Sequence, residues 1–378
     1  MNISIKHFIR FGIQNWLSCN STKIYHSLYR TMVSKTPELG KPAEGEDVWL
    51  DKWRQYDKKL SPLAYRIFSR YIGNDINIMP MELCVRLVEP ILTPVEYRPY
   101  YSDKNSFGKI LQGIKQPYVY VRNIRGFFFD NDYNSLGKNP LFELEKNKVD
   151  SFVLKPSRSD SGRGVMIFRN NNGQYVASDN TVFSLELLNK AYKQDFLIQE
   201  CVSQGSFNSY FNPTSINTLR IATYKDVKTG EVHYLRAVMR IGRTGTEVDN
   251  SHAGGSFVGI DENGVLGKYL CNQWGERTTV FNDIEFENNT FRVPDYERIK
   301  QFAIQIGKKV VHHNLVAMDI AIDSDNDPQL IEINVGSFSG KLFQLTSGTV
   351  FGDYTDDVME YATQKMKNTR LKLSFYRR

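Results

Sequence analysis

Two apolar, strand-like runs that carry acidic residues constrain this chain more than any other feature. Residues 316–336 read V-A-M-D-I-A-I-D-S-D-N-D-P-Q-L-I-E-I-N-V-G, with Asp319 in the first run and Glu332 and Asn334 in the second. Residues two apart in a strand face the same side, so Glu332 and Asn334 project together. If the polar stretch between the runs forms a turn, Asp319 lies opposite them on the partner strand. Two carboxylates and an amide oxygen then converge on one face.

A carboxylate pair in a buried sheet requires a positive partner, because an uncompensated buried charge is costly. Oxygen ligands of this kind suit Mg²⁺, which keeps several waters and nucleotide phosphate oxygens in its shell. The alternative is that Asp319 and Glu332 only pair with Lys or Arg at the edge of a sheet. The hairpin alone leaves both interpretations open.

Two stretches near this hairpin resemble the sequence patterns of known ligand-binding loops but lack residues that those patterns require. D-S-D-N-D-P, residues 323–328, begins like a calcium loop, yet Pro328 stands where that loop needs Gly and its twelfth position is Asn334. We therefore predict a turn there. G-S-F-S-G-K-L, residues 336–342, resembles a P-loop, but it is one residue short and ends in Leu rather than Ser or Thr.

The periodicity of apolar residues predicts an α+β protein. Residues 1–100 carry apolar residues at spacings of three and four and are expected to be mostly helical. From residue 150 onward short strands, hairpin turns and occasional helices follow one another. Hairpins without regular strand–helix alternation favour α+β lobes over a doubly wound sheet.

Composition and charge exclude several functional classes. The net charge is +6, and residues 361–378 alone hold six basic residues and no acid, so the remainder is neutral. A neutral body with a basic tail does not indicate a nucleic-acid binder, although peripheral membrane contact by the tail stays open. Four widely separated cysteines argue against a zinc site and a disulfide framework. The scattered cysteines indicate a reducing compartment, so we expect a cytoplasmic protein. The amino-terminal apolar stretch is too interrupted for a signal peptide.

A lysine before a glycine-rich turn predicts a phosphate site. F-V-L-K-P-S-R-S-D-S-G-R-G-V-M-I-F, residues 152–168, places Lys155 at the end of a strand, followed by Gly162 and Gly164. The glycines let backbone N–H groups approach an anion, and the lysine adds a point charge. Such a turn is weak evidence alone and gains weight from the acidic hairpin downstream.

Three further stretches contain polar groups in otherwise apolar strands or loops. F-L-I-Q-E-C-V-S-Q, residues 196–204, is either a plain buried strand or a hinge that hydrogen-bonds a flat heterocycle. Arg220 and Arg240 each lie inside an apolar strand, where the acidic hairpin or phosphate oxygens would be suitable partners. V-D-N-S-H-A-G-G-S-F, residues 248–257, is a glycine-rich loop suited to substrate binding, and its His252 more often marks a surface residue than a base.

Taken together, these stretches resemble the ATP-grasp superfamily in their order along the chain. The spacing of Asp319, Glu332 and Asn334 is similar to that in D-alanine–D-alanine ligases. S-D-K-N-S-F-G-K-I-L-Q-G, residues 102–113, resembles the segment that opens the ATP-grasp unit in those ligases and makes Lys104 the first phosphate-binding lysine. The stretches S-I-N-T-L-R and V-D-N-x₃-G-G look more like the sugar-transfer-associated branch, related to the α-L-glutamate ligases.

The resemblance implies a specific organisation and site. It implies a helical region over residues 1–100, ATP-grasp lobes over 101–203 and 204–350, and a carboxyl-terminal helix and basic tail over 351–378. ATP and Mg²⁺ are the implied cofactors, with the metal on Asp319, Glu332 and Asn334 and catalytic roles for Arg220, Arg240 and Lys155. The nucleotide would contact Lys104, Lys155, Ser161, Gly162, Arg163, Gly164, Gln199, Glu200, Val202 and Asn208, and the substrate loop would contribute Asp249, Asn250, Gly254 and Gly255.

The implied activity is ATP-dependent ligation of a carboxylate to an amine through an acyl phosphate. The family link to surface polysaccharides implies an amide between a uronic acid and an amino acid. A departure from the D-alanine ligases is Ala317, which replaces an arginine, so Arg220 or Arg240 must supply that charge. A kinase on the same fold and a non-catalytic nucleotide-binding module stay as alternatives.

Overall fold

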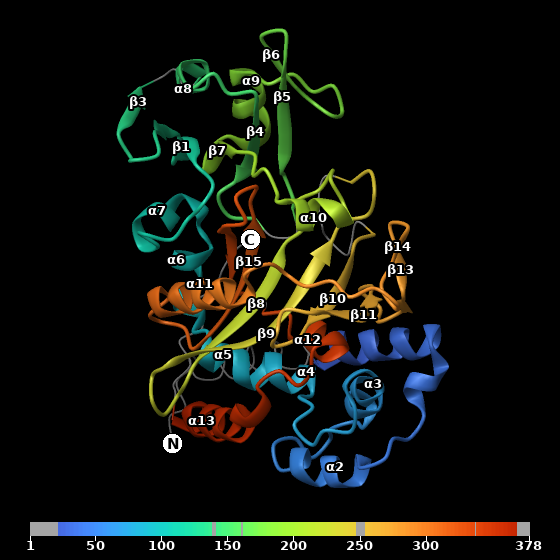
Figure 1. The fold of residues 1–378 in the computed structure, drawn as a ribbon. Coiled ribbons are helices and arrows are strands. Elements are labelled where there is room, and N and C mark those ends of the chain that lie inside the picture. Colours follow the sequence, from blue (N-terminus) through green and yellow to red (C-terminus); the bar gives the residue numbers. More distant parts are fainter. Residues whose placement is uncertain (1–21, 138–140, 160–161, 247–253, 337, 369–378) are drawn as a thin grey trace.

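The computed structural model describes residues 22–137, 141–159, 162–246, 254–336 and 338–368. It contains two seven-stranded antiparallel sheets and a helical amino-terminal region (Figure 1). The helical segments before the first strand are residues 22–35, η1 Pro37–Gly40, α2 Glu46–Arg54, α3 Leu63–Ile72, α4 Met81–Leu83, η2 Cys84–Val88, α5 Glu89–Leu92, η3 Val95–Tyr97, α6 Arg98–Ser102, η4 Lys104–Ser106 and α7 Phe107–Ile110.

The first sheet forms the upper lobe in Figure 1 and has the strand order β3-β2-β1-β7-β4-β5-β6. Successive side chains of a strand point to opposite sides, so this sheet has one face toward the core of the lobe and one face toward the cleft. Phe152, Phe168 and Ile198 pack in the lobe core, whereas Val153 and Lys155 face the cleft. The strands are β1 Val119–Ile124, β2 Phe127–Phe129, β3 Ser135–Gly137, β4 Ser151–Pro156, β5 Met166–Asn171, β6 Gln174–Ala177 and β7 Phe196–Glu200, with helices α8 Leu141–Lys146, α9 Leu185–Leu187 and η5 Leu188–Tyr192.

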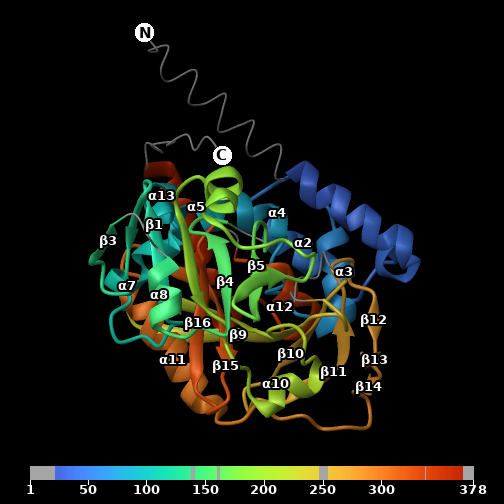
Figure 2. The ribbon, with the colours of Figure 1, turned by 90° about the horizontal axis from the view of Figure 1, so that it is seen from above.

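The second sheet has the strand order β12-β11-β10-β9-β8-β15-β16 and lies between two layers of helices (Figure 2). Helix α11 covers one face, and α12, α13 and the amino-terminal helices cover the other. The elements are α10 Ser206–Phe211, β8 Leu219–Lys225, β9 Val232–Ile241, β10 Ser256–Ile260, β11 Leu266–Cys271, β12 Arg277–Thr278, β13 Val280–Phe281, β14 Ile284–Glu285, α11 Tyr296–Lys309, β15 Leu315–Ile322, β16 Pro328–Asn334, α12 Gly340–Thr346, η7 Gly352–Tyr354 and α13 Thr355–Asn368.

The helical region shares one hydrophobic core with the second sheet. Trp49, Trp53 and Phe68 from the helices belong to the same buried cluster as Ala222 and Phe257 from the strands. The side chain of Gln344 on α12 adds polar contacts, because its Oε1 accepts from Met79 N at 2.7 Å and its Nε2 donates to Met79 O at 2.9 Å. The helical region therefore packs directly against the second sheet, as one wall of its core, and is not a separate domain core.

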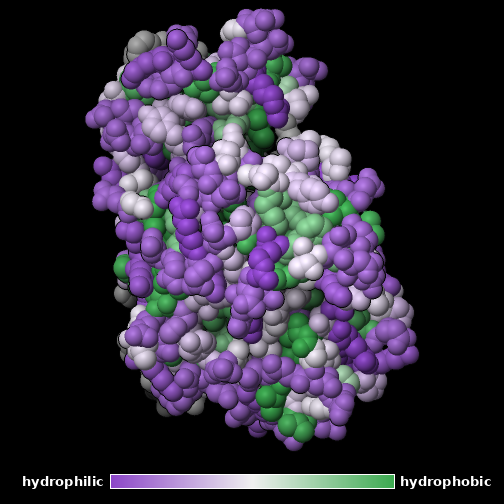
Figure 3. All heavy atoms as spheres, in the orientation of Figure 1, coloured by the Kyte–Doolittle hydropathy of each residue, from purple (hydrophilic) through white to green (hydrophobic). Residues whose placement is uncertain are grey.

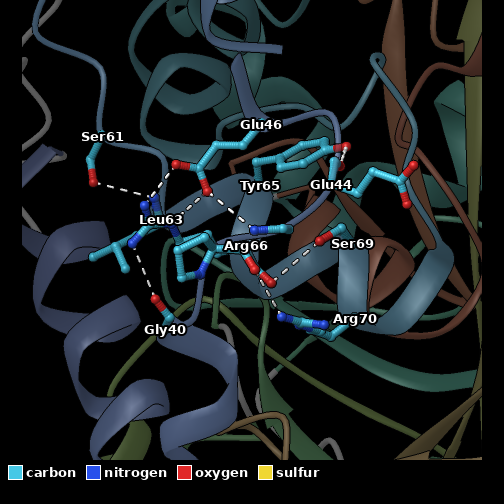
Figure 4. A network of polar contacts seen from close by, with 11 residues as sticks. Gly40, Glu44, Glu46, Ser61, Leu63, Tyr65, Arg66, Ser69 and Arg70 are labelled. Carbon is cyan, nitrogen blue, oxygen red and sulfur yellow. Dashed lines mark hydrogen bonds and ion pairs between the residues drawn. The ribbon is translucent and has the colours of Figure 1, made fainter. Parts of the chain in front are cut away.

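An ion pair between two helices stiffens this wall (Figure 4). Arg66 on α3 donates from Nε and Nη2 to both carboxylate oxygens of Glu46 on α2, at 2.6 and 2.7 Å. Its Nη1 also donates to Gly40 O at 3.1 Å, and the Tyr65 hydroxyl donates to Glu44 O at 2.7 Å. Bidentate arginine–carboxylate pairs fix orientation as well as distance, so these contacts hold α2, α3 and the turn before α2 together.

The α+β fold class expected from the sequence is confirmed, with helices over residues 22–110 and strands from residue 119 onward. The predicted turn at residues 323–328 is also confirmed, because the chain reverses there between β15 and β16. The domain boundaries at residues 100, 203 and 350 stay predictions. Among the described residues, no helix combines the length and hydrophobicity needed to cross a membrane.

Candidate active site

A cleft of about 840 Å³ lies between the two sheets and contains most of the polar groups singled out from the sequence. The surface is indented at this level, between the upper lobe and the body of the molecule (Figure 3). The cleft-facing side chains of β4, β5 and β7 form its roof, and one face of β8, β9, β15 and β16 forms its floor. The charged residues that line it are Lys104, Lys155, Arg169, Glu200, Arg220, Arg240, Asp319, Glu332 and Lys341.

The acidic hairpin has the geometry expected from its sequence. Strands β15 and β16 pair antiparallel with Asp319 directly opposite Glu332, and Ala317 opposite Asn334. On its other side Asp319 lies opposite Arg220 of β8. Because cross-strand partners share a face, Glu332, Asp319 and Arg220 form one row across the floor of the cleft.

Asp319 is the most strongly bound acid of this row. Arg220 donates to its two oxygens from Nε and Nη2, at 2.5 and 2.8 Å, and Arg240 Nη1 adds a third contact at 3.1 Å. Asn334 Nδ2 lies 3.5 Å from Oδ2. Burial raises the pKa of Asp319, but the two guanidinium groups outweigh it and hold the pKa at about 2. The acid is therefore ionised over the whole physiological range.

Two lysines approach the row from the upper lobe and its entry segment. Lys104 Nζ lies 3.3 Å from Glu332 Oε2 and donates to Ser159 O at 3.1 Å, in the loop after β4. Lys155 on β4 is buried, and burial together with the charge of Lys104 lowers its pKa to about 7. A buried lysine whose charge is this poorly compensated favours an incoming anion.

The glycine-rich turn is only partly brought to the cleft. Gly162 and Gly164 both have positive φ, at 70° and 71°, which explains their identity. Gly162 lines the cleft, whereas Arg163 and Gly164 are exposed and do not. The predicted contact Ser161 lies outside the described residues.

The end of β7 lies in the cleft. Gln199, Glu200 and Val202 all line it. Glu200 Oε1 accepts from Gln329 Nε2 of β16 at 3.2 Å, so this strand end joins the two sheets. Asn208 is placed differently: it lies on α10 with its side chain buried, donates to Asn217 O at 2.6 Å and does not line the cleft. The structure thus gives it a structural hydrogen bond rather than a nucleotide contact.

The predicted substrate loop lies mainly outside the described residues, which include neither Asp249 nor Asn250. Gly254 is exposed with a φ of 89°, and Gly255 is buried next to it. Neither glycine lines the cleft, although Ser256 and Phe257 directly after them do.

Several cleft residues were missed by the sequence analysis. Ser339 accepts a hydrogen bond from Arg220 Nη1 at 3.1 Å, and Lys341 follows it at the beginning of α12. Both lie in the stretch that resembles a P-loop without satisfying its pattern. The helix over residues 22–35 contributes Ile24, Tyr25 and Leu28, for which the sequence carries only an amphipathic pattern.

The donor set fits a divalent cation together with a phosphate chain. A carboxylate has about four acceptor positions, and the three arginine contacts together with the contact from Asn334 take up those of Asp319, so Glu332 is the freer carboxylate for a metal. Glu332 is 22% exposed, lines the cleft and contacts Lys104. No group of three or more His, Cys, Asp or Glu is arranged for a metal within the part of the chain that the structure describes. A metal here would thus need the amide oxygen of Asn334 and phosphate oxygens.

The net charge of the cleft distinguishes this site from a cluster of purely structural ion pairs. The acids do pair with Lys and Arg, as the alternative interpretation of the hairpin expected. However, six basic residues line the cleft against three acidic ones. The excess of positive charge favours an anionic ligand.

Comparison with solved structures gives ATP-grasp ligases at low similarity. A D-alanine–D-alanine ligase from Coxiella burnetii is 11% identical with a TM-score of 0.40, covering 71% of this chain and 60% of its own. The ATP-grasp ligase PsnB with minimal precursor, Mg and ADP is 10% identical with a TM-score of 0.40, covering 85% and 74%. The Bacillus anthracis D-alanine–D-alanine ligase with ATP is 13% identical with a TM-score of 0.38, covering 71% and 68%. Such values carry no conclusion about substrates.

A comparison with protein families is decisive at the level of the family. No match was found among curated proteins. The sequence model described as sugar-transfer associated ATP-grasp matches residues 89–358, which is most of the chain. This match confirms the predicted family and fold, and the description of the family supports ATP as a ligand. The chain belongs to the sugar-transfer-associated ATP-grasp family.

Proposed function

We propose that this protein is an ATP-dependent carboxylate–amine ligase whose product is an amide. The observation that carries the proposal is the row of Glu332, Asp319 and Arg220 beneath Lys104 and Lys155 in one cleft. Such a site offers carboxylates for a metal and several cations for phosphate oxygens. Acyl-phosphate chemistry requires no side-chain nucleophile.

Different residues are assigned to the phosphates, the adenine and the metal. In this proposal Lys104 and Lys155 bind phosphate oxygens, and the end of β7 at Gln199–Val202 binds the adenine. Glu332 and Asn334, with Asp319 beside them, would hold Mg²⁺, which would supply charge neutralisation for the transferring phosphoryl group. Phosphoryl transfer depends mainly on positioning and charge, which a rigid sheet floor provides.

The reaction has two balanced steps. A substrate carboxylate oxygen forms a bond to the γ-phosphorus while the bond to ADP breaks, giving an acyl phosphate and ADP. A neutral amine then attacks the acyl carbon, phosphate leaves with the electrons of the C–O bond, and the amine proton passes to solvent. Arg220 and Arg240 stabilise the oxyanion that forms between these events. Both are fixed by Asp319, so they need no rearrangement to act.

The substrate pair is the finer part of the proposal. Membership of a sugar-transfer-associated family supports a carbohydrate acid as the carboxylate and an amino acid as the amine. This pairing would place the protein in surface-polysaccharide biosynthesis. It rests on the family description and on the excess positive charge of the cleft, which suits an acidic sugar.

Omission experiments test the ligase directly. The purified protein is incubated with ATP, Mg²⁺, uronic acids in free and nucleotide-linked form, and amino acids, and ADP and free phosphate are measured together. The ligase is supported if ADP and free phosphate are released in equal amounts and only when both the acid and the amine are present. ADP without matching free phosphate contradicts it and indicates the kinase alternative. ATP binding without turnover in any pool also contradicts it and indicates a binding module.

A further inference from the structure

Lys341 is a cleft lysine for which the proposed ligase chemistry has no use. It lies at the beginning of α12, seven residues after Asn334, in the stretch that imitates a P-loop. Its Nζ donates to Gln273 O at 2.7 Å. Within the described residues no carboxylate pairs with it, although it is largely buried at the cleft wall. Burial lowers its pKa to about 8, as expected for an ammonium group without a counter-ion.

The carbonyl that Lys341 contacts belongs to a tightly built turn. Asn272 Oδ1 accepts from Trp274 N at 2.9 Å and from Glu276 N at 3.1 Å. Gly275 has a φ of 79°, and a side chain there would collide with the Tyr71 hydroxyl. That hydroxyl donates to Gly275 O at 2.5 Å. The amino-terminal helices therefore fix the turn, and the turn fixes one donor of the lysine.

The cleft that Lys341 lines also has an apolar part. The helix over residues 22–35 presents Ile24, Tyr25 and Leu28 to the cavity. Ile24 is 58% exposed, which is unusual for a large aliphatic side chain in a polar cleft. An ammonium group with two remaining donors thus shares one cavity with an aliphatic and aromatic surface.

We propose that Lys341 and the helix over residues 22–35 form a second subsite, which binds an organic anion through a carboxylate or phosphate group and packs against its carbon skeleton. This subsite rests on the proposed ligase function, in which it holds the part of a substrate that does not react. The Lys341 ammonium donates to the anionic group, and Ile24, Tyr25 and Leu28 cover the ring or chain. Glu332 and Asp319 line the same cleft, so a substrate bound in the subsite would extend toward Glu332.

Direct binding measurements test the subsite without turnover. Titration calorimetry is done with Mg²⁺ and a non-hydrolysable ATP analogue present, so that the nucleotide site is filled. Glucuronate and galacturonate form the carboxylate arm, and inorganic phosphate and UDP-glucuronate form the phosphate arm. We expect Lys341→Gln to weaken binding in at least one arm about tenfold, because a charged hydrogen bond is lost. The dissociation constant of the ATP analogue should stay unchanged, and Lys308→Gln, an exposed lysine on α11, should match the wild type.

Ile24 supplies a second variant that leaves the buried lysine in place. Ile24→Glu adds a negative charge at the wall and should weaken anion binding, whereas Ile24→Gln should weaken it less. Equal binding by wild type, Lys341→Gln and Ile24→Glu would overturn the subsite, and so would the absence of binding in both arms. If only the ligase proposal is wrong, no amide product forms, but anion binding still depends on Lys341.

Discussion

Arg220 and Asp319 lie directly opposite each other on neighbouring strands and are joined by two hydrogen bonds of 2.5 and 2.8 Å. Both side chains are nearly inaccessible to solvent. The pair explains how an apolar strand tolerates a carboxylate, because the arginine offsets the free-energy cost of burying its negative charge. It also leaves Asp319 ionised on the floor of the cleft, beside Glu332.

Removing Arg220 should therefore destabilise the fold as well as the site. Arg220→Met leaves Asp319 with Arg240 alone, and we expect the free energy of unfolding to fall by about 3–5 kcal/mol. Urea denaturation followed by circular dichroism measures this change. The double variant Arg220→Met/Asp319→Asn should be more stable than Arg220→Met, because it no longer buries an uncompensated charge. A double variant that is less stable than Arg220→Met would contradict this account.

Glu332 should matter for turnover and not for folding. It is 22% exposed on an edge strand, so Glu332→Gln loses only one ion pair with Lys104. We expect a nearly unchanged melting temperature and a loss of ATP turnover of at least about 100-fold, as for other preorganised charged groups. Glu262→Gln, an exposed acid between β10 and β11, is the matched control. Turnover that survives Glu332→Gln would remove this residue from the proposed site.

Lys155 should take up a proton when ATP binds. Burial and Lys104 lower its pKa to about 7, so at pH 8 most molecules carry a neutral Lys155 before binding. Phosphate oxygens favour the ammonium form, and binding at pH 8 should consume about one proton. Calorimetry of ATP binding in buffers of different ionisation enthalpy measures this number. Lys155→Met should bind more weakly with little uptake, whereas unchanged uptake in this variant would assign the proton to another group.

The Glu46–Arg66 pair should make stability depend on pH in the acid range. The ion pair with Arg66 lowers the pKa of Glu46 below its usual 4.5, so its contribution is present above that value and is lost as pH falls below it. At pH 7 we expect Glu46→Gln to cost about 1–2 kcal/mol of unfolding free energy. Denaturation curves at pH 7 and pH 3 should show a smaller difference between wild type and variant at the lower pH. A difference that grows toward pH 3 would contradict the assignment.

The acidic hairpin was predictable because strand geometry is strict. A period of two fixes which residues share a face, and the short polar turn fixes the register, so Asp319 opposite Glu332 follows from the sequence. Lys155 was predictable for the same reason, since its neighbours Phe152 and Leu154 alternate into a core. The arginine partners were predicted as a pair of candidates, and the structure places both on Asp319.

The helical wall and the α12 lysine were not predictable from local pattern. Ile24 and Leu28 read as ordinary helix positions, and only tertiary packing brings that helix to the cleft. Lys341 lies in a stretch that fails a known motif, and its contact with Gln273 joins positions 68 residues apart. Asn208 shows the converse error: its polar side chain suggested a ligand contact, but a buried hydrogen bond to Asn217 O occupies it.

Transfer of oxygen from acid to phosphate tests the central claim most directly. The carboxylate substrates are labelled with ¹⁸O and incubated with ATP, Mg²⁺, the amino acids and the protein, and the phosphate products are examined by mass spectrometry. An acyl phosphate requires that one ¹⁸O atom from the acid appears in the released phosphate and that the amide keeps the other. Unlabelled phosphate, or a phosphoryl group retained on the sugar, would contradict the proposed ligase.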